Sequence, residues 1–430
     1  MNVRKVLSIT VLLAALVFLS VGAVSAQDSV TINWWTIFTT PPELTALAET
    51  VAQEFMDANP GVTIEITHLE NEAFKERLAT VMQAGDPPDL FQSWGGGVLW
   101  TYADAGLLRD ITPELTADEA AWQNSFATQA ALNLYSKDGV YYGVPLTFGA
   151  VGFWYNTRLF AEAGIESIPA TWTEFLGVVE TLKASGTIPI AVGGLDKWPG
   201  HFWWVYLAIR EGGQAAFEAA YTREGTFADE AFVEAGNRLN ELLALEPFQP
   251  DFNALGYGPA AGLMGNGEAA MELMGQWAPG VQQGNSTSGE GLPEGELGWF
   301  PFPLVEGGAG DATDVLGGGD GIAVGANAPD EAVEFLKYLT SPEVQIRFAE
   351  LGTGFIPTVT EAESAITDPL LQDIVEARNN AAYYQLYYDQ FLPPAVAQQV
   401  LDAVQGLFTA TMSPEEAAQS IEDVASFELE

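Results

Sequence analysis

Four tryptophans follow predicted strands, and each has glycine or polar residues beside it. They are Trp35, Trp94, Trp198 and Trp277. An indole ring offers a flat apolar face and one N–H donor. The C–H face of a pyranose can stack on such a ring while nearby amides and carboxylates bond its hydroxyls. A single tryptophan in such a place is more often a core residue, but four in equivalent places favour a sugar-binding site.

The clearest of these stretches is 265–280, which reads GNGEAAMELMGQWAPG. Its first residues predict a tight turn, and the short apolar run through Met274 predicts a buried strand. Gly275 ends that strand, and we expect its missing side chain to let a ligand approach the backbone. The amide of Gln276 can bond sugar hydroxyls. The stretch holds no nucleophile, base or metal-ligand set for catalysis.

The elements that must position these residues alternate between strand and helix. Period-two patterns predict strands at 29–35 and 62–66, and a short apolar run predicts a third at 90–91. Helical spacing follows the first strand at 43–58 and the second around 74–85. This order predicts βαβ units and a mainly parallel sheet, in which ligands bind at the carboxyl ends of the strands.

Later segments carry further local signals. A turn within 138–145 predicts a hairpin or edge strand, and capping boxes at 171–174 and 413–416 predict helix starts. Continuous helices are expected across 217–245 and 369–388. The region 282–296 is rich in glycine, serine and glutamate and predicts an exposed loop.

Length and composition narrow the class of protein. A chain of 430 residues predicts two domains. The net charge of −43 makes nucleic acid and anionic membranes poor partners, because both would be repelled. The absence of cysteine excludes disulfides, thiolate metal sites, a cysteine nucleophile and lipid attachment through cysteine.

The N-terminus has the pattern of a secretory signal peptide. Arg4 and Lys5 precede an apolar run at 6–21, and small residues at 24–26 form a cleavage site. We therefore predict a signal peptide over 1–26 and a mature protein exported across the cytoplasmic membrane. A retained N-terminal membrane anchor is the alternative.

The sequence gives weaker support for metal binding, nucleotide binding or glycoside hydrolysis. The two histidines, His68 and His201, are far apart in sequence and do not suggest a metal site. The glycine-rich segment 317–321 lacks the Lys-Ser/Thr of a phosphate loop. A glycosidase needs two carboxylates across one bond, but with 58 acidic residues such pairs carry no weight.

Paired tyrosines at 383–384 and 387–388 resemble those that bind ferric iron in some binding proteins. We favour an aromatic helix face as the explanation. A secreted glycoside hydrolase and a binding protein for a non-sugar solute, such as ferric iron or a polyamine, remain the alternatives to a sugar-binding protein.

Several motifs along the mature chain resemble one protein family. The most specific are the opening stretch through Trp277, the segments 88–90, 143–145, 154–156 and 171–175, and the chain end at 389–393 and 413–418. With these motifs the chain resembles extracellular solute-binding proteins of carbohydrate ABC importers, the broad group that includes maltose-binding protein. Many relatives carry a lipid-anchoring cysteine after the signal peptide, and this chain does not.

The resemblance implies an α/β fold with two discontinuous lobes, joined by hinge segments, and a ligand cleft between them (the type II periplasmic-binding-protein fold). It places lobe 1 at 29–146 plus 309–351 and lobe 2 at 147–306 plus 352–430. It further implies a non-enzymatic monomer without cofactor or metal. Such a protein closes on a sugar and docks on the membrane permease subunits of the importer.

Strand-end position and the cleft of the family together predict the ligand contacts. Several tryptophans in one cleft favour a di- or oligosaccharide over a monosaccharide. The predicted contacts are Trp35, Thr36, Gln92, Ser93, Trp94, Asp196, Lys197, Trp198, Gln276, Trp277, Gly319, Asp320, Tyr387 and Asp389.

Overall fold

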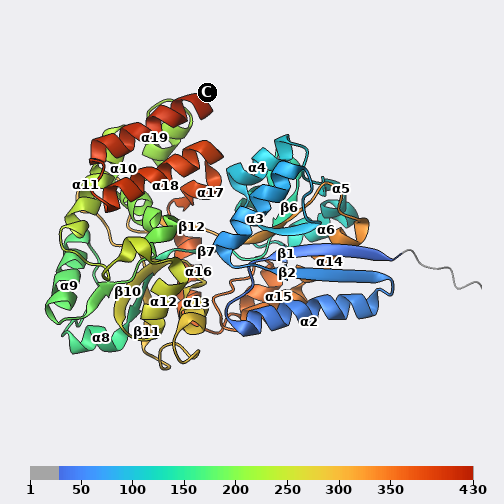
Figure 1. Cartoon of the computed structure of the whole chain (residues 1–430), viewed down its shortest axis with the longest axis horizontal. Coiled ribbons are helices and arrows are strands. Elements are labelled where there is room, and N and C mark those ends of the chain that lie inside the picture. Colours follow the sequence, from blue (N-terminus) through green and yellow to red (C-terminus); the bar gives the residue numbers. More distant parts are fainter. Residues whose placement is uncertain (1–28, 430) are drawn as a thin grey trace, which may run out of the picture.

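The computed structural model describes residues 29–429, so the predicted signal peptide lies outside the described residues. Figure 1 shows two bodies side by side, one built mainly from the first part of the chain together with α14 (Asp330–Leu339) and α15 (Pro342–Glu350), and the other mainly from the middle and the end. We call them the first and the second lobe. Within 29–429, no helix has both the length and the apolar character needed to cross a bilayer.

The first lobe is built on a five-stranded sheet in the order β2-β1-β3-β13-β6. Strand β1 runs parallel to both of its neighbours, as the alternating pattern predicted, while β13 is antiparallel to β3 and β6. The strands are β1 (Val30–Thr36), β2 (Val62–His68), β3 (Leu90–Ser93), β6 (Gly143–Pro145) and β13 (Gly321–Val324).

Longer helices such as α2 and α14 cover this sheet with an apolar stripe. In α2, for example, Ala48, Val51 and Phe55 are buried at helical spacing. The predicted hairpin is present as β4 (Ser136–Lys137) and β5 (Val140–Tyr141), followed by β6. The helices are α2 (Pro42–Ala58), α3 (Asn71–Ala84), α4 (Gly96–Asp104), α5 (Thr112–Leu115), α6 (Ala117–Ser125), α7 (Gln129–Asn133), α14 (Asp330–Leu339) and α15 (Pro342–Glu350).

The second lobe surrounds a four-stranded sheet in the order β11-β8-β10-β9. Strand β10 is buried along its whole length, which explains its unbroken apolar run. It is antiparallel to β8 and parallel to β9. The strands are β8 (Gly152–Asn156), β9 (Ile188–Ile190), β10 (Ala269–Met274) and β11 (Leu297–Phe300).

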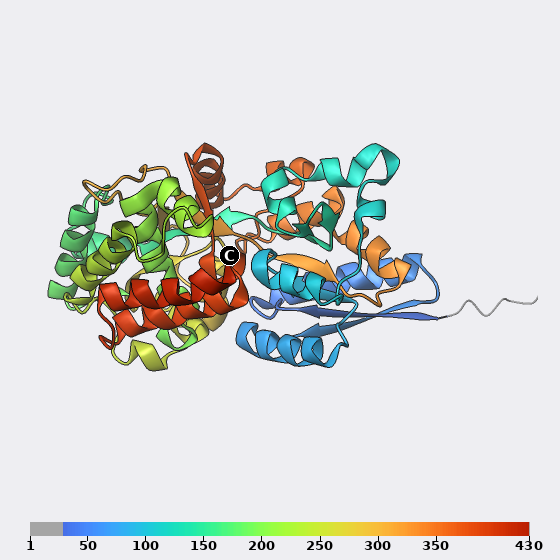
Figure 2. The same cartoon turned by 90° about the horizontal axis from the view of Figure 1, so that it is seen from above.

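The helices of the second lobe include both predicted capping boxes, at the starts of α9 and α19. Seen from above, the red C-terminal helices pack on this lobe (Figure 2). The helices are α8 (Thr157–Glu162), α9 (Trp172–Ala184), α10 (Trp198–Tyr221), α11 (Glu230–Leu243), α12 (Tyr257–Gly265), α13 (Ala278–Asn285), α16 (Pro369–Asn380), α17 (Tyr388–Phe391), α18 (Pro394–Phe408) and α19 (Pro414–Glu428).

A small third sheet, β14-β12-β7, lies where the chain passes between the lobes. Strand β7 follows β6 of the first lobe after three residues, and β12 precedes β13. These short strands therefore fix the direction in which the chain leaves one lobe and enters the other. Their bounds are β7 (Gly149–Ala150), β12 (Val315–Gly318) and β14 (Tyr384–Leu386).

Buried Arg210 fixes the path of the crossing segment before β12. Its guanidinium donates to five backbone carbonyls between residues 302 and 314, at N···O distances of 2.7 to 3.2 Å. A buried charge is costly unless hydrogen bonds compensate it. Its side chain makes all the bonds that its five N–H groups allow, and so ties helix α10 to the crossing segment.

Two long helices predicted from the sequence are wrong in their extent. The helix expected across 369–388 ends at Asn380, because Tyr384 to Leu386 pair with β12 instead. The helix expected across 217–245 is interrupted between α10 and α11. The backbone N–H of Phe227, in that interruption, donates to the Glu422 carboxylate at 2.9 Å. In both places a tertiary partner outweighs local helix propensity.

Candidate functional site

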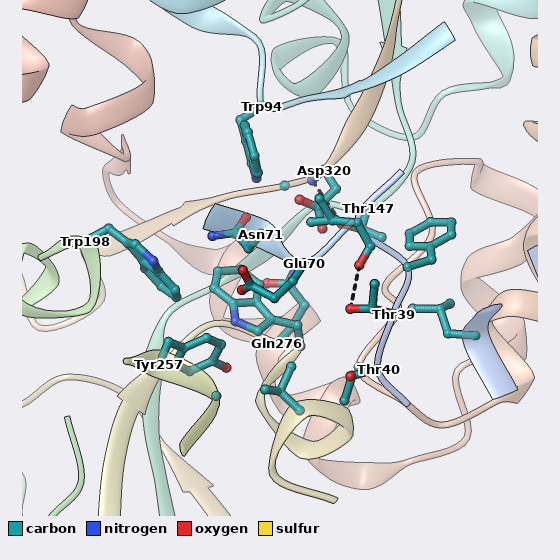
Figure 3. A pocket seen from close by; sticks show the side chains of 18 of the residues that line it. Thr39, Thr40, Glu70, Asn71, Trp94, Thr147, Trp198, Tyr257, Gln276 and Asp320 are labelled. Atoms are coloured by element: carbon teal, nitrogen blue, oxygen red, sulfur yellow. Dashed lines mark hydrogen bonds between the residues drawn. The ribbon is translucent and has the colours of Figure 1, made fainter. Parts of the chain in front are cut away.

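A cavity of about 230 Å³ lies between the two lobes. Figure 3 shows Trp198 and Tyr257 on one side of it. Thr39, Thr147 and Asp320 lie on the other side. The residues that line it are Ile37, Phe38, Thr39, Thr40, Leu44, Glu70, Asn71, Lys75, Trp94, Thr147, Trp198, Phe202, Tyr257, Gly258, Gln276, Trp277, Val281, Asn285, Gly319, Asp320, Thr353, Gly354, Phe355, Tyr387, Asp389 and Gln390.

Aromatic rings dominate the wall that the second lobe contributes. Trp198 begins helix α10, and its ring lies 4.8 Å from that of Tyr257 and 6.4 Å from that of Trp277, centroid to centroid. Tyr387 packs against Trp277 in a T-shaped contact at 6.3 Å. Because these rings support each other at their edges, their positions are fixed before a ligand arrives. We call this group the aromatic wall.

Several buried polar atoms around the cavity have no hydrogen-bond partner. They are the hydroxyl oxygens of Tyr257 and Tyr387 and the Oε1 atom of Gln276. Asp389 Oδ1 lies 3.3 Å from His201 Nε2. The side chains of Gln276 and Tyr387 are only 1% and 5% exposed. A buried polar group without a partner costs free energy, so such groups in a cavity lining point to a ligand that bonds them.

Gly275 does not serve the role predicted for it. A Cβ atom at this position would lie 2.3 Å from the ring of Trp277, so the indole itself fills the space that the glycine leaves. The carbonyl of Gly275 accepts the indole N–H of Trp154 at 3.0 Å. The glycine therefore seats the tryptophan, and the expectation that a ligand approaches the backbone here is wrong.

The first lobe contributes a wall of polar and charged residues, which we call the polar wall. Glu70, Asn71 and Lys75 lie at the start of helix α3, directly after the end of β2. Glu70 Oε2 caps this helix by accepting the backbone N–H of Glu72 at 2.9 Å. Trp94 follows the end of β3, and its ring packs against Phe74.

Asp320 is half-buried at the junction of β12 and β13. Gln92 Nε2 donates to its Oδ1 at 2.8 Å, and the Asp320 backbone N–H donates to Thr147 Oγ1 at 3.1 Å. Burial raises the pKa of Asp320 to about 6, although hydrogen bonds from Gln92, Trp94 and Thr147 oppose that rise. At neutral pH the group is ionised and can accept a hydroxyl of a ligand.

The two walls touch each other through Glu72. Its Oε1 accepts three donors: Asn71 Nδ2 at 2.7 Å, Lys75 Nζ at 2.9 Å and the indole N–H of Trp198 at 3.1 Å. The first two come from the first lobe and the third from the second. The lobes also meet at Gly97, where a Cβ atom would lie 2.2 Å from the carbonyl oxygen of Leu392. The structure is therefore a closed form.

Eight of the predicted contacts line the cavity and six do not. The eight are Trp94, Trp198, Gln276, Trp277, Gly319, Asp320, Tyr387 and Asp389. The six outside the lining are Trp35, Thr36, Gln92, Ser93, Asp196 and Lys197.

Two of the six, Gln92 and Asp196, hold residues of the lining through hydrogen bonds from distant parts of the chain. Gln92 holds Asp320, and Asp196 Oδ2 accepts the backbone N–H of Tyr257 at 2.7 Å. Lys197 pairs with Asp402 at 2.6 Å, outside the cavity. Trp35 packs its ring under the guanidinium of Arg77 at 4.5 Å.

The remaining two bond their own loops: Thr36 Oγ1 accepts the backbone N–H of Phe38 at 3.2 Å, and Ser93 Oγ accepts that of Gly95 at 3.1 Å. Strand β1 continues through Thr36, so the loop that reaches the cavity is 37–40. Because the strand extends through Thr36, the cavity is lined by residues 37–40 and not by the predicted Trp35 and Thr36.

Sequence reasoning missed Glu70, Asn71 and Lys75. Their signal was present, because they follow the carboxyl end of the parallel strand β2. No tryptophan directly follows β2, so the expectation built on tryptophans at strand ends does not extend to them. Tyr257 and Asn285 lie on helices α12 and α13, remote from any strand end, and only tertiary packing brings them to the cavity.

The paired tyrosines do not converge on one point. Tyr383 donates to Gln385 Oε1 at 2.6 Å, and Tyr384 donates to the carbonyl oxygen of Gly149. Tyr388 is buried in the core of the second lobe, and Tyr387 faces the cavity. Tyr384 begins strand β14 and Tyr387 follows that strand, so the aromatic helix face that we favoured is wrong.

Comparison with known proteins places this geometry in a family. A sequence profile described as bacterial extracellular solute-binding protein matches residues 40–346, well over half of the chain. The chain belongs to this family. The fold is the two-lobed type II solute-binding fold.

Individual relatives match most of this chain and most of their own length. The multiple sugar-binding protein of Streptococcus mutans is 26% identical over 356 residues, which cover 80% of this chain and 79% of that protein. A solved chitin oligosaccharide binding protein is 27% identical with a TM-score of 0.84, covering 94% of this chain and 99% of that one. A solved protein from work on xylan utilisation by Caldanaerobius polysaccharolyticus has the same identity and TM-score, covering 92% and 99%.

Proposed function

We propose that the protein captures a carbohydrate between its lobes and delivers it to an ABC importer. The observation that carries this proposal is the aromatic wall beside buried acceptors that have no partner. A pyranose would stack on Trp277 while its hydroxyls bond Gln276, Tyr387 and Asp320. The bonds to Gln276 and Tyr387 would satisfy buried atoms that have no partner within the protein.

The lobes would open and close about the small third sheet. We place the crossings at 146/147, 306/309 and 351/352. The passage from β6, in the sheet of the first lobe, to β7, in the third sheet, supports the first of these. A ligand that contacts both walls favours the closed state by its differential affinity for that state.

We infer a di- or oligosaccharide as the ligand, a monomeric binding protein without enzymatic activity, and a location outside the cytoplasmic membrane. The names of the relatives, which include multiple-sugar and chitin oligosaccharide binding proteins, support the class of ligand. The predicted signal peptide supports export. The closed form would dock on the membrane subunits of the importer.

A thermal-shift screen of the mature protein against neutral mono-, di- and oligosaccharides tests the proposal. We expect at least one sugar to raise the melting temperature, to bind with one-to-one stoichiometry in calorimetry and to be recovered unchanged by chromatography. Release of a hydrolysis product would instead identify a glycosidase. A shift only with ferric iron or a polyamine would replace the sugar by that solute.

A further inference from the structure

The cavity has an uneven charge. Three carboxylates line it, those of Glu70, Asp320 and Asp389, and Lys75 is the single lysine among the lining residues, which include no arginine. An ammonium group brought by a ligand would meet favourable charges here, whereas a carboxylate would meet repulsion.

The ammonium of Lys75 already occupies a site built for a cation. Its Nζ atom lies 5.6 Å from the ring centroid of Trp94 and 5.7 Å from that of Trp198, within reach of cation–π attraction to both. Glu72 Oε1 accepts from it at 2.9 Å. Two aromatic faces and a carboxylate are what a protein offers to an alkylammonium group.

The positive charge of Lys75 is therefore committed to the protein. Its nearest partner is Glu72, and it also acts on Asp389. Burial opposes the ionisation of Asp389, but His201 and Lys75 outweigh that effect and lower its pKa. A carboxylate on a ligand would have to draw Lys75 away from these groups.

An uncommitted buried acceptor strengthens the case. Gln276 Oε1 has no hydrogen-bond donor, and its side chain is 1% exposed. Acceptors are satisfied by hydroxyl or ammonium hydrogens and not by another carboxylate. The lining is therefore suited to a ligand that carries hydrogen-bond donors.

Resting on the proposed function, we propose that the cavity selects among sugars by charge. A sugar that carries a free amine binds more tightly than its uncharged counterpart, and a sugar that carries a carboxylate is rejected. Until such a ligand arrives, Lys75 fills the cation site between Trp94 and Trp198.

Four matched disaccharides test this selection by calorimetry at neutral pH: chitobiose with free amines, its N,N′-diacetyl form, digalacturonate and the dimethyl ester of digalacturonate. We expect the amine to bind roughly tenfold more tightly than the acetylated form, and the ester roughly tenfold more tightly than the acid. Above about pH 9, where such amines lose their charge, the first preference should disappear.

Lys75→Met separates the two roles that this lysine could have. If it fills the cation site, its removal strengthens binding of the free amine several-fold and does not improve binding of digalacturonate. Glu70→Gln, a second variant, should narrow the gap between amine and acetylated form. Lys183→Met is the matched control, because Lys183 pairs with Glu246 at 2.8 Å outside the cavity, and it should leave all four affinities unchanged.

Tighter binding of digalacturonate than of its ester, abolished by Lys75→Met, would overturn the inference by making Lys75 an anion receptor. Equal affinity within each pair would overturn it as well, as would failure of all four disaccharides to bind. The proposed function falls only if the whole panel of neutral sugars also fails.

Discussion

The aromatic wall and the polar wall meet the same cavity with different chemistry. The aromatic wall is made of rings that pack on one another, and Trp277 is seated by Gly275 of its own strand end. The polar wall is made of groups at helix and strand termini, such as Glu70 at the start of α3. The difference suggests a division of labour: the aromatic wall supplies contact area, and the polar wall supplies orientation and charge.

The largest effect should come from the aromatic wall. Trp277→Ala removes a stacking surface, and we expect the affinity for the sugar found in the screen to fall roughly 10- to 100-fold, whereas Trp94→Ala in the polar wall should cost less. Calorimetry measures both. Trp35→Ala is the matched control, since its ring lies under Arg77 and outside the cavity lining. Equal losses for Trp94 and Trp277 would erase the distinction between the walls.

Asp320, in the polar wall, should make the free energy of unfolding depend on pH. Folded Asp320 holds its proton up to about pH 6, whereas an aspartate in the unfolded chain loses it near pH 4. Between these values the folded state binds more protons, so the free energy of unfolding falls as pH rises, by on the order of 2–3 kcal/mol from this group. Urea unfolding of Asp320→Asn should lack that fall. An unchanged pH profile would contradict the assignment.

Glu272, in strand β10 behind the aromatic wall, provides a comparison. Burial raises its pKa to about 7, although a hydrogen bond from Gln282 opposes the rise. The same sign applies, but the loss of stability should extend to about pH 7. Glu272→Gln should therefore remove the upper part of the pH profile in urea unfolding, whereas Asp320→Asn should remove only the part below about pH 6.

The contact between the lobes at Gly97 can be broken with one methyl group. Gly97→Ala would place Cβ 2.2 Å from the carbonyl oxygen of Leu392, so the closed form becomes strained. We expect a larger radius of gyration in X-ray scattering of the ligand-bound protein and an affinity lower by roughly tenfold. Gly177→Ala, in α9 with nothing within 4 Å of its Cβ, is the control and should close normally.

The smallest effect should follow loss of the Glu72 link between the walls. Glu72→Ala removes the acceptor of the Trp198 indole, and we expect the affinity to fall only about three- to fivefold, because water can replace a half-exposed acceptor. Glu241→Ala is matched, since Glu241 accepts the Trp172 indole at 3.1 Å within the second lobe. If both variants bind sugar equally, the link does not stabilise closure.

The sequence predicted one wall better than the other, for a physical reason. Tryptophans and glycines that follow predicted strands can be recognised from the sequence alone. Trp198 and Trp277, found in this way, line the cavity. Glu70 and Lys75 are ordinary helix residues whose role depends on the end of β2 lying beside the other lobe. Tyr257 enters through packing between helices, which no local pattern encodes.

The elements of the fold that local patterns determine were also predicted better than those that depend on distant parts of the chain. Alternating and helical patterns located the βαβ units of the first lobe, because burial of one face dictates the period. Strand β14 departs from the predicted helix, because Tyr384 pairs with β12 from another part of the chain. Segments that cross between lobes are short, and long-range pairing rather than local propensity determines them.

The central claim is that a sugar binds between the two walls, stacked on Trp277. A crystal structure of the protein with the sugar found in the screen tests it most directly. We predict density for a pyranose ring against the Trp277 indole, with hydroxyls bonded to Gln276 and Asp320. A sugar bound anywhere else, or a cavity in which the ring avoids Trp277, would contradict the account.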